Sequence, residues 1–222
     1  MLTHPNSLQV YMVRYFSEAL GTALVTLAVI GSGIMARNLT DDPALQLLVN
    51  ALATTSTLFL MIQLFQKVSG SHFNPMVSIF ALSKKNIGQM FGYITAQFVG
   101  ATGGAVAANL MFELPSISIA TTTREGNHLF FAEFIASAGL LFIIFLKAKK
   151  VKAIRPALIT LWILGAYFFT SSTSFANPVI TFGRMLSDSF AGIAPSSAMM
   201  FIAIQIIGSS AGYSLALAMR KK

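Results

Sequence analysis

The sequence predicts an all-α membrane protein with six transmembrane helices and two re-entrant half-helices, arranged as an inverted three-plus-three repeat. This fold class is predicted by three observations: the composition, the lengths of the uncharged runs and two matching short segments. Of the 222 residues, 55% are hydrophobic and only 10% are charged, whereas an average soluble chain is about 25% charged. This composition excludes an ordinary soluble domain and a disordered chain. The absence of cysteine excludes disulfides, thiolate metal sites and cysteine nucleophiles.

Six apolar runs have the length of membrane spans. A bilayer core of about 30 Å needs about 20 helical residues. The runs cover residues 11–36, 43–66, 86–112, 127–146, 156 onward and 189–219. The first run lacks the basic cap and the small-residue cleavage site of a signal peptide, so we expect it to be retained.

Two shorter segments remain, at residues 74–83 and 177–187. Helices of these lengths would measure about 15 Å and 16 Å. Each is about half as long as a membrane span needs to be. Two such helices that meet end to end would therefore cross the bilayer together.

The distribution of basic residues predicts the orientation. With six spans, both termini share one side, and 12 of the 15 lysines and arginines fall there. That side carries Arg14, Lys67, Lys84, Lys85, Lys147, Lys149, Lys150, Lys152, Arg155, Arg220, Lys221 and Lys222. The other side carries only Arg37, Arg124 and Arg184. The positive-inside rule then places both termini and the first short segment in the cytoplasm, and the second short segment enters from outside.

The two halves of the chain, approximately residues 8–112 and 126–219, resemble each other within one transmembrane domain of residues 1–222. An Asn-Pro pair recurs at Asn74 and Asn177, and a glutamate recurs early in spans one and four, at Glu18 and Glu133. The pattern Gln-x-x-Gly-x-x-x-Gly occurs at residues 97–104 and 205–212, and its small residues let helices approach closely. Three spans per half is an odd number, so the second half is inverted, which indicates a transport site at the midplane.

The two Asn-Pro pairs predict helix starts at the membrane centre. Asparagine is a favoured N-cap, and proline is favoured at the first helical position, so we expect helices to begin at Pro75 and Pro178. Two positive dipole ends would then face a lumen that Asn74 and Asn177 supply with N–H donors. Neutral hydroxylic solutes can bind such groups and the loop carbonyls, whereas cations meet a positive potential.

With these motifs the chain resembles the aquaporins of the major intrinsic protein family. Residues 69–78, Ser-Gly-Ser-His-Phe-Asn-Pro-Met-Val-Ser, are similar to the first family signature, and residues 174–179 are similar to the second. The resemblance implies a passive channel, not an enzyme, for water, glycerol, polyols and metalloid hydroxides that excludes ions and protons. It also implies a homotetramer in the inner membrane with one pore per subunit, no cofactor and no nucleic-acid partner. Glu18 and Glu133 would support the re-entrant loops. Residues 174–195 are further similar to bacterial aquaporins associated with arsenic handling.

Departures from the family pattern concern the pore. Met76 and Val179 replace the usual alanines beside the pore centre. Ile180 occupies the position, three residues after the second asparagine, where orthodox members carry the filter arginine. Spacing transfers the remaining filter positions to Thr54, Gly165 and Ser174. These four residues predict a wide, apolar selectivity filter without a fixed cation.

Arg184 and His72 allow two interpretations each. Arg184 lies one helical turn beyond Ile180; we favour a side chain that reaches the interface or pairs with Asp188 over one that replaces the missing arginine. His72 would either line the cytoplasmic half of the pore or hold its loop by a hydrogen bond.

Two other classes of membrane protein stay open. Glu18 and Glu133 could relay protons in an ion- or proton-coupled transporter. Met76, Val179 and phenylalanines could instead close the pore of an adhesive protein.

Overall fold

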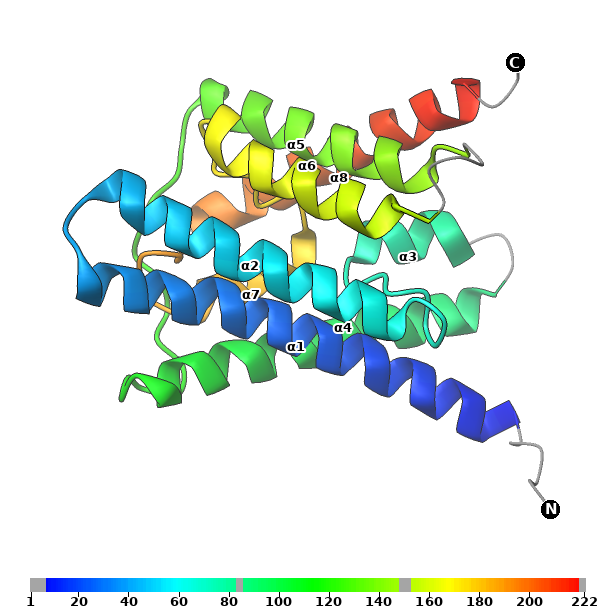
Figure 1. Cartoon of the computed structure of the whole chain (residues 1–222), viewed down its shortest axis with the longest axis horizontal. Coiled ribbons are helices and arrows are strands. Elements are labelled where there is room, and N and C mark those ends of the chain that lie inside the picture. The colour runs from blue at the N-terminus through cyan, green and yellow to red at the C-terminus, as the bar shows by residue number, and fades with distance from the viewer. Residues whose placement is uncertain (1–6, 83–85, 148–152, 220–222) are drawn as a thin grey trace.

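The structure is a computed structural model that describes residues 7–82, 86–147 and 153–219. Within these ranges it contains eight α-helices and no strand. They are α1 (Ser7–Leu39), α2 (Pro43–Phe65), α3 (Pro75–Leu82), α4 (Ile87–Met111), α5 (Asn127–Phe145), α6 (Arg155–Phe169), α7 (Pro178–Met185) and α8 (Pro195–Ala218). Six long helices surround the short helices α3 and α7 (Figure 1).

The bundle has two ends, which we name by the chain. The terminal end is where α1 begins and α8 finishes, and the far end is where α1 turns into α2 (Figure 1). Helix α3 lies toward the terminal end and α7 toward the far end. The two short helices therefore enter the bundle from opposite sides, as the sequence predicts.

The long helices differ in how well they fit a membrane span. Helices α1, α2, α5 and α8 are long and apolar enough to cross a bilayer. The other two long helices meet these criteria less well. Helix α6 has only 15 residues and is about 22 Å long, which is shorter than a full span. Helix α4 is long enough at 25 residues, but it includes glycine, glutamine and asparagine. Helix α8 begins at Pro195 rather than at residue 189, because proline favours the first turn and cannot continue a helix that precedes it.

Polar caps fix other helix starts. The Asp42 carboxylate accepts hydrogen bonds from the backbone N–H groups of Ala44 (2.8 Å) and Leu45 (3.2 Å), and Pro43 follows it at the first helical position. Asn86 accepts a bond from the backbone N–H of Gln89 at the start of α4. These side chains satisfy backbone donors that a helix leaves unpaired at its N-terminus.

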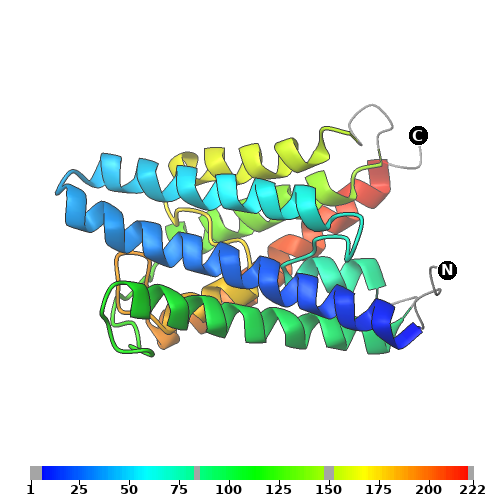
Figure 2. The same cartoon turned by 60° about the horizontal axis from the view of Figure 1, so that its bottom comes forward.

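Helix pairs pack in the same way in both halves. Helix α1 packs mainly on α4, which lies beside it in Figure 2, and α5 packs mainly on α8. A Cβ atom added to Gly104 would lie 2.2 Å from the carbonyl oxygen of Ala23, and one added to Gly212 would lie 1.9 Å from that of Ala138. Glycine is therefore required where each pair crosses, as the repeated pattern predicts.

The buried core surrounds the short helices. Val179 of α7 packs in one apolar cluster with Val25 and Val29 of α1. Met76 of α3 packs in a second cluster with residues of α5 and α6. The short helices are thus held by apolar contacts on their outer sides, which leaves their N-termini at the centre of the bundle.

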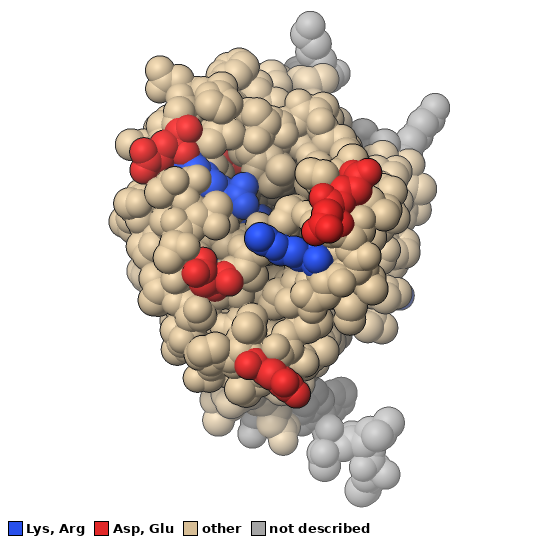
Figure 3. All heavy atoms as spheres, turned by 90° about the vertical axis from the view of Figure 1, so that its left-hand side faces the viewer, with Lys and Arg blue, Asp and Glu red and all other residues tan. Residues whose placement is uncertain are grey.

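Apart from the buried Glu18 and Glu133, the described charged side chains collect toward the two ends of the bundle. Arg14, Lys67, Lys147 and Arg155 belong to the terminal end. The other basic residues expected there, Lys84, Lys85, Lys149, Lys150, Lys152, Arg220, Lys221 and Lys222, lie outside the described residues. The far end has basic side chains around a central hollow and acidic side chains nearer the rim (Figure 3).

Candidate pore

The N-termini of α3 and α7 are tied to each other by the two asparagines. The Asn74 side-chain oxygen accepts a hydrogen bond from the backbone N–H of Met76 (2.9 Å), and that of Asn177 accepts one from Val179 (3.1 Å). The amide of Asn74 donates to the carbonyl of Ala176 (3.2 Å). The amide of Asn177 donates to the carbonyl of Phe73 (2.8 Å). Each asparagine therefore caps its own helix and holds the opposite loop.

Glu18 supports the loop before α3. Its side chain is completely buried. One carboxylate oxygen accepts hydrogen bonds from the Ser69 hydroxyl (2.6 Å) and the backbone N–H of His72 (2.9 Å). The other accepts bonds from the backbone N–H of Phe73 (2.8 Å) and the side-chain amide of Gln97 (2.8 Å).

Glu133 makes the equivalent contacts in the second half. It is also completely buried and accepts bonds from the Ser172 hydroxyl (2.6 Å) and the side-chain amide of Gln205 (2.7 Å). The backbone N–H groups of Phe175 and Ala176 each donate to it at 2.9 Å. The described donors to both carboxylates are loop N–H groups, a serine hydroxyl and a glutamine amide, which is the arrangement of a structural acceptor.

The two loops share an unusual backbone. Ser71 and Phe73 have φ values of 52° and 46°, and Ser174 and Ala176 have values of 53° and 49°. Left-handed residues at alternate positions cost about 1–3 kcal/mol each and persist only where the surroundings hold them. The two glutamates supply that support by collecting the loop N–H groups. The described residues donate no hydrogen bond to the carbonyls of Ser71, His72, Ser174 or Phe175.

A narrow cavity of about 80 Å³ passes the two asparagines. A water molecule needs about 10–15 Å³ of such volume, so the cavity has room for a short file of waters. Its walls are mostly aliphatic, and its polar groups come from the two loops and from Thr54, Tyr167 and Arg184 on the helices. A wider vestibule of about 300 Å³ at the terminal end is lined by Gln66, His72 and Arg155 among others.

Most of the predicted pore residues line this cavity. They are Thr54, His72, Asn74, Ser174, Asn177, Ile180 and Arg184. A 3.0 Å hydrogen bond also joins His72 Nδ1 and the Ser78 hydroxyl, so His72 both lines the cavity and is held by a hydrogen bond. Pro75 and Pro178 are the first residues of α3 and α7.

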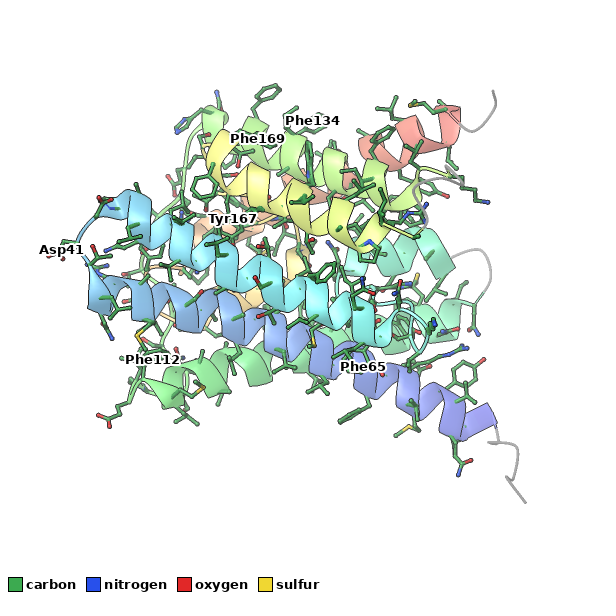
Figure 4. All side chains as sticks on the ribbon, viewed as in Figure 1. Asp41, Phe65, Phe112, Phe134, Tyr167 and Phe169 are labelled. Carbon is green, nitrogen blue, oxygen red and sulfur yellow. The ribbon has the colours of Figure 1, made fainter. Side chains whose placement is uncertain are left out.

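Five predicted pore positions are not among the lining residues: Pro75, Pro178, Gly165, Met76 and Val179. Gly165 is not among the lining residues; α6 presents Ile159, Ile163 and Tyr167 to the cavity, four residues apart on one helical face. Tyr167 lies between α6 and α2 (Figure 4). Met76 and Val179 are also not among the residues that line the cavity, and both are buried in apolar clusters. Their predicted place at the pore centre is therefore corrected.

Arg184 enters the cavity, so the expectation of a side chain that reaches outward is wrong. The side chain is only 3% exposed. Its Nε donates to the carbonyl of Ala191, and its guanidinium carbon lies 3.3 Å from the centroid of the Phe175 ring. Asp188, the expected partner, instead accepts bonds from the backbone N–H and hydroxyl of Thr121. The segment after α7 folds back over Arg184, which prevents an outward course.

The prediction that the filter lacks a fixed cation is also corrected, because Arg184 lines the cavity. Arg184, Tyr167 and Phe175 join Thr54, Ser174 and Ile180 at the far end of the cavity. Tyr167 and Phe175 were missed from the sequence. The four-residue spacing of Ile159, Ile163 and Tyr167 was the only signal for the former.

Several polar atoms at this end have no hydrogen-bond partner among the described residues. The Ser174 hydroxyl is buried and makes no hydrogen bond within the described residues. The Thr54 hydroxyl lies beside Tyr167 but has no hydrogen bond of normal geometry. The terminal nitrogens of Arg184 have no described protein acceptor. Buried groups of this kind need partners from solvent or solute.

Comparison with known proteins identifies the family. The family model of the major intrinsic proteins matches residues 6–172. The chain belongs to the major intrinsic protein family. This major intrinsic protein is 39% identical over 204 residues to aquaglyceroporin AqpS of Rhizobium meliloti, covering 91% of this chain and 88% of that one. It is 26% identical over 185 residues to an aquaglyceroporin of Toxoplasma gondii, covering 80% of this chain and 66% of the relative.

A solved structure supports the fold. The aquaglyceroporin of Plasmodium falciparum superimposes with a TM-score of 0.66 at 18% identity, covering 93% of this chain and 94% of that one. The family resemblance and the fold class predicted from the sequence are thus confirmed.

Proposed function

We propose that this chain forms a passive membrane channel for water and small uncharged solutes such as glycerol and related polyols. The observation that carries the proposal is the narrow cavity that runs past two opposed helix N-termini and their asparagines. Membership of a family of channels, and relatives that are named aquaglyceroporins, support it. Metalloid hydroxides are small, neutral and hydroxylic, and we include them in the solute class.

Cations are excluded by the charge pattern of the lumen. The positive dipole ends of α3 and α7 face the centre, and each asparagine presents amide donors there. Both buried carboxylates are occupied by four described donors each and do not line the cavity. A hydrated cation therefore loses its water without gaining a counter-charge.

We further propose that the far end selects hydroxylic solutes. Arg184 offers donors, and the Ser174 and Thr54 hydroxyls can both donate and accept. Phe175 and Ile180 offer an apolar wall to the carbon skeleton. A polyol has hydroxyl groups on one edge and C–H groups on the other, and it matches both surfaces.

The coupled-transporter alternative is not favoured. A proton relay needs carboxylates that exchange protons with neighbouring titratable groups. The carboxylates of Glu18 and Glu133 instead accept bonds from backbone N–H, serine and glutamine donors. These contacts use both oxygens of each carboxylate, and no described titratable side chain donates a hydrogen bond directly to either glutamate.

Osmotic measurements on proteoliposomes test the function. We expect faster water flow than in empty liposomes, with a low activation energy, and faster glycerol entry without any ion gradient. If neither solute moves faster than in empty liposomes, the channel proposal is wrong. If flux requires a pH or sodium gradient, the coupled transporter replaces it.

The selectivity site has its own test. Arg184→Ala removes the largest polar side chain from the far end, so we expect entry of the five-carbon polyol xylitol to rise relative to water. Arg37→Ala is the matched control, because Arg37 is an exposed arginine at the same end. An unchanged xylitol-to-water ratio in Arg184→Ala would remove Arg184 from the site and leave the channel proposal intact.

We also propose that the protein is a homotetramer in the inner membrane with both termini in the cytoplasm. The chain has no cysteine, so single cysteines at exposed Arg37 and Lys147 can be labelled separately in intact cells. An impermeant maleimide should reach position 37 and not position 147. The reverse pattern would invert the orientation, and native mass spectrometry of the detergent-solubilised protein would reveal any other oligomer.

A further inference from the structure

Three successive carbonyl groups hold two arginines at the far end. The carbonyl of Phe190 accepts a bond from Arg124 Nη2 (3.3 Å), and that of Gly192 accepts one from Arg124 Nε (3.1 Å). The carbonyl of Ala191, between them, accepts the bond from Arg184 Nε. Residues 190–192, which we call the carbonyl clamp, therefore join the two side chains.

The two guanidinium groups also share an aromatic ring. Arg184 lies 3.3 Å and Arg124 lies 5.2 Å from the centroid of the Phe175 ring. Among the described residues neither arginine forms an ion pair. Burial lowers the pKa of Arg124, and the charge of Glu133 opposes that shift. Two like charges are thus held close by carbonyl dipoles and a π face rather than by carboxylates.

The clamp itself is rigidly placed. Ala191 is 1% exposed, and a Cβ atom added to Gly192 would lie 2.6 Å from the carbonyl oxygen of Ser187. Arg124 is anchored on its other side, because its backbone N–H donates to the Ser197 hydroxyl (2.9 Å).

The connection that carries Arg124 follows the segment after α7. The backbone N–H of Ala120 donates to the carbonyl of Met185 (2.9 Å), and that of Ala194 donates to the carbonyl of Thr122 (2.7 Å). Arg124 is thereby delivered to the clamp from the α4–α5 connection, a part of the chain distant in sequence from both pore loops.

We propose that Arg124 is a positioning residue for solute selection, acting through the carbonyl clamp on Arg184. The inference rests on the proposed role of Arg184 in the far-end site. The planar fork of Arg124 holds the Phe190 and Gly192 carbonyls at once, which fixes the direction of the Ala191 carbonyl and so the position of the Arg184 guanidinium. Lysine has the charge but not the fork, so charge alone does not suffice.

A double-mutant cycle tests the proposal in proteoliposomes. Arg124→Ala and Arg124→Lys should both raise the xylitol-to-water permeability ratio, by about tenfold if one hydrogen bond to a charged group is lost. In an Arg184→Ala background, Arg124→Ala should add no further change, because its effect passes through Arg184. Arg37→Ala removes an exposed far-end arginine outside the clamp and should leave the ratio unchanged.

The outcomes separate the two proposals. If Arg184→Ala changes the ratio and neither Arg124 variant does, the positioning role is wrong and the far-end site stands. If Arg124→Lys behaves as wild type and Arg124→Ala does not, charge rather than geometry acts, and the positioning role is again wrong. Full additivity of Arg124→Ala and Arg184→Ala also overturns it. If Arg184→Ala itself changes nothing, the far-end site fails.

Discussion

Replacing Glu133 by glutamine removes the support of the second pore loop with almost no change of shape. The carboxylate accepts four hydrogen bonds, from the Ser172 hydroxyl, the backbone N–H groups of Phe175 and Ala176, and the amide of Gln205. A glutamine amide keeps one accepting oxygen and presents an NH₂ group at the other position. Two of the four groups that donate to Glu133 then face this NH₂ group instead of an accepting oxygen.

The cost of the substitution follows from these contacts. A hydrogen bond to a charged group contributes about 1.5–3 kcal/mol, so two lost bonds amount to about 3–6 kcal/mol. Because the side chain is fully buried, water cannot replace the lost acceptor. Folded domains have about 5–15 kcal/mol of stability in total. We therefore expect a large fall in thermal stability and a loss of water flux.

Thermal unfolding in detergent and stopped-flow water permeability measure these two effects. Ser137→Ala is the matched control, since Ser137 lies one turn further along α5, is buried, and has a hydroxyl without a described partner. Glu18→Gln should behave as Glu133→Gln does, with Thr22→Val as its control, because the Thr22 hydroxyl is likewise buried and unpartnered. The reasoning is refuted if Glu133→Gln unfolds at the wild-type temperature and conducts water normally.

Three other substitutions test separate parts of the structure. Gly212→Ala places a methyl group against the carbonyl of Ala138 and should lower the free energy of unfolding by about 1–3 kcal/mol through overpacking. In the control Gly103→Ala the added methyl meets nothing within 4 Å, so stability should not fall. Equal unfolding temperatures of the two variants would contradict the close packing. Asn74→Asp puts a negative charge at the two helix N-termini and should raise sodium leak into liposomes; an unchanged leak with intact water flux would show that the barrier lies elsewhere. Ile180→Arg adds a cation one turn from Arg184 and should reduce glycerol flux more than water flux; an equal loss of both would mean that Ile180 does not border the solute.

The sequence predicts the bundle and its centre well because backbone requirements leave residue-type signals. Charges delimit the spans, Asn-Pro pairs start the half-helices, and buried glutamates satisfy loops that have no other acceptor. The run starting at residue 156 predicts a full span, but α6 ends at Phe169. Beyond Phe169 the chain stays uncharged as far as Arg184, although residues 170–174 are all serine or threonine, so a lack of charge alone does not locate that end.

The far end was predicted less well because its side-chain directions depend on how a loop folds. Spacing transferred from the family placed Gly165 in the filter, whereas Tyr167 occupies the lining face of α6. Arg184 was expected to reach outward, and it turns inward because the Ala191 carbonyl meets it there. No local pattern encodes the path of residues 187–194, which is set by contacts with the distant α4–α5 connection.

The two ends of the pore differ at positions that the repeat relates to each other. Asn74 and Asn177 are 103 residues apart, and the same interval relates Ala81 of α3 to Arg184 of α7. Ala81 lines the vestibule of about 300 Å³ at the terminal end, whereas Arg184 lines the far end of the cavity of about 80 Å³. Both halves build the same loop and helix N-terminus, so this common scaffold cannot by itself distinguish the two ends. Selection must then come from residues that break the repeat, and Arg184, which its neighbours hold inward, is the largest such difference on the pore-facing side of the short helices.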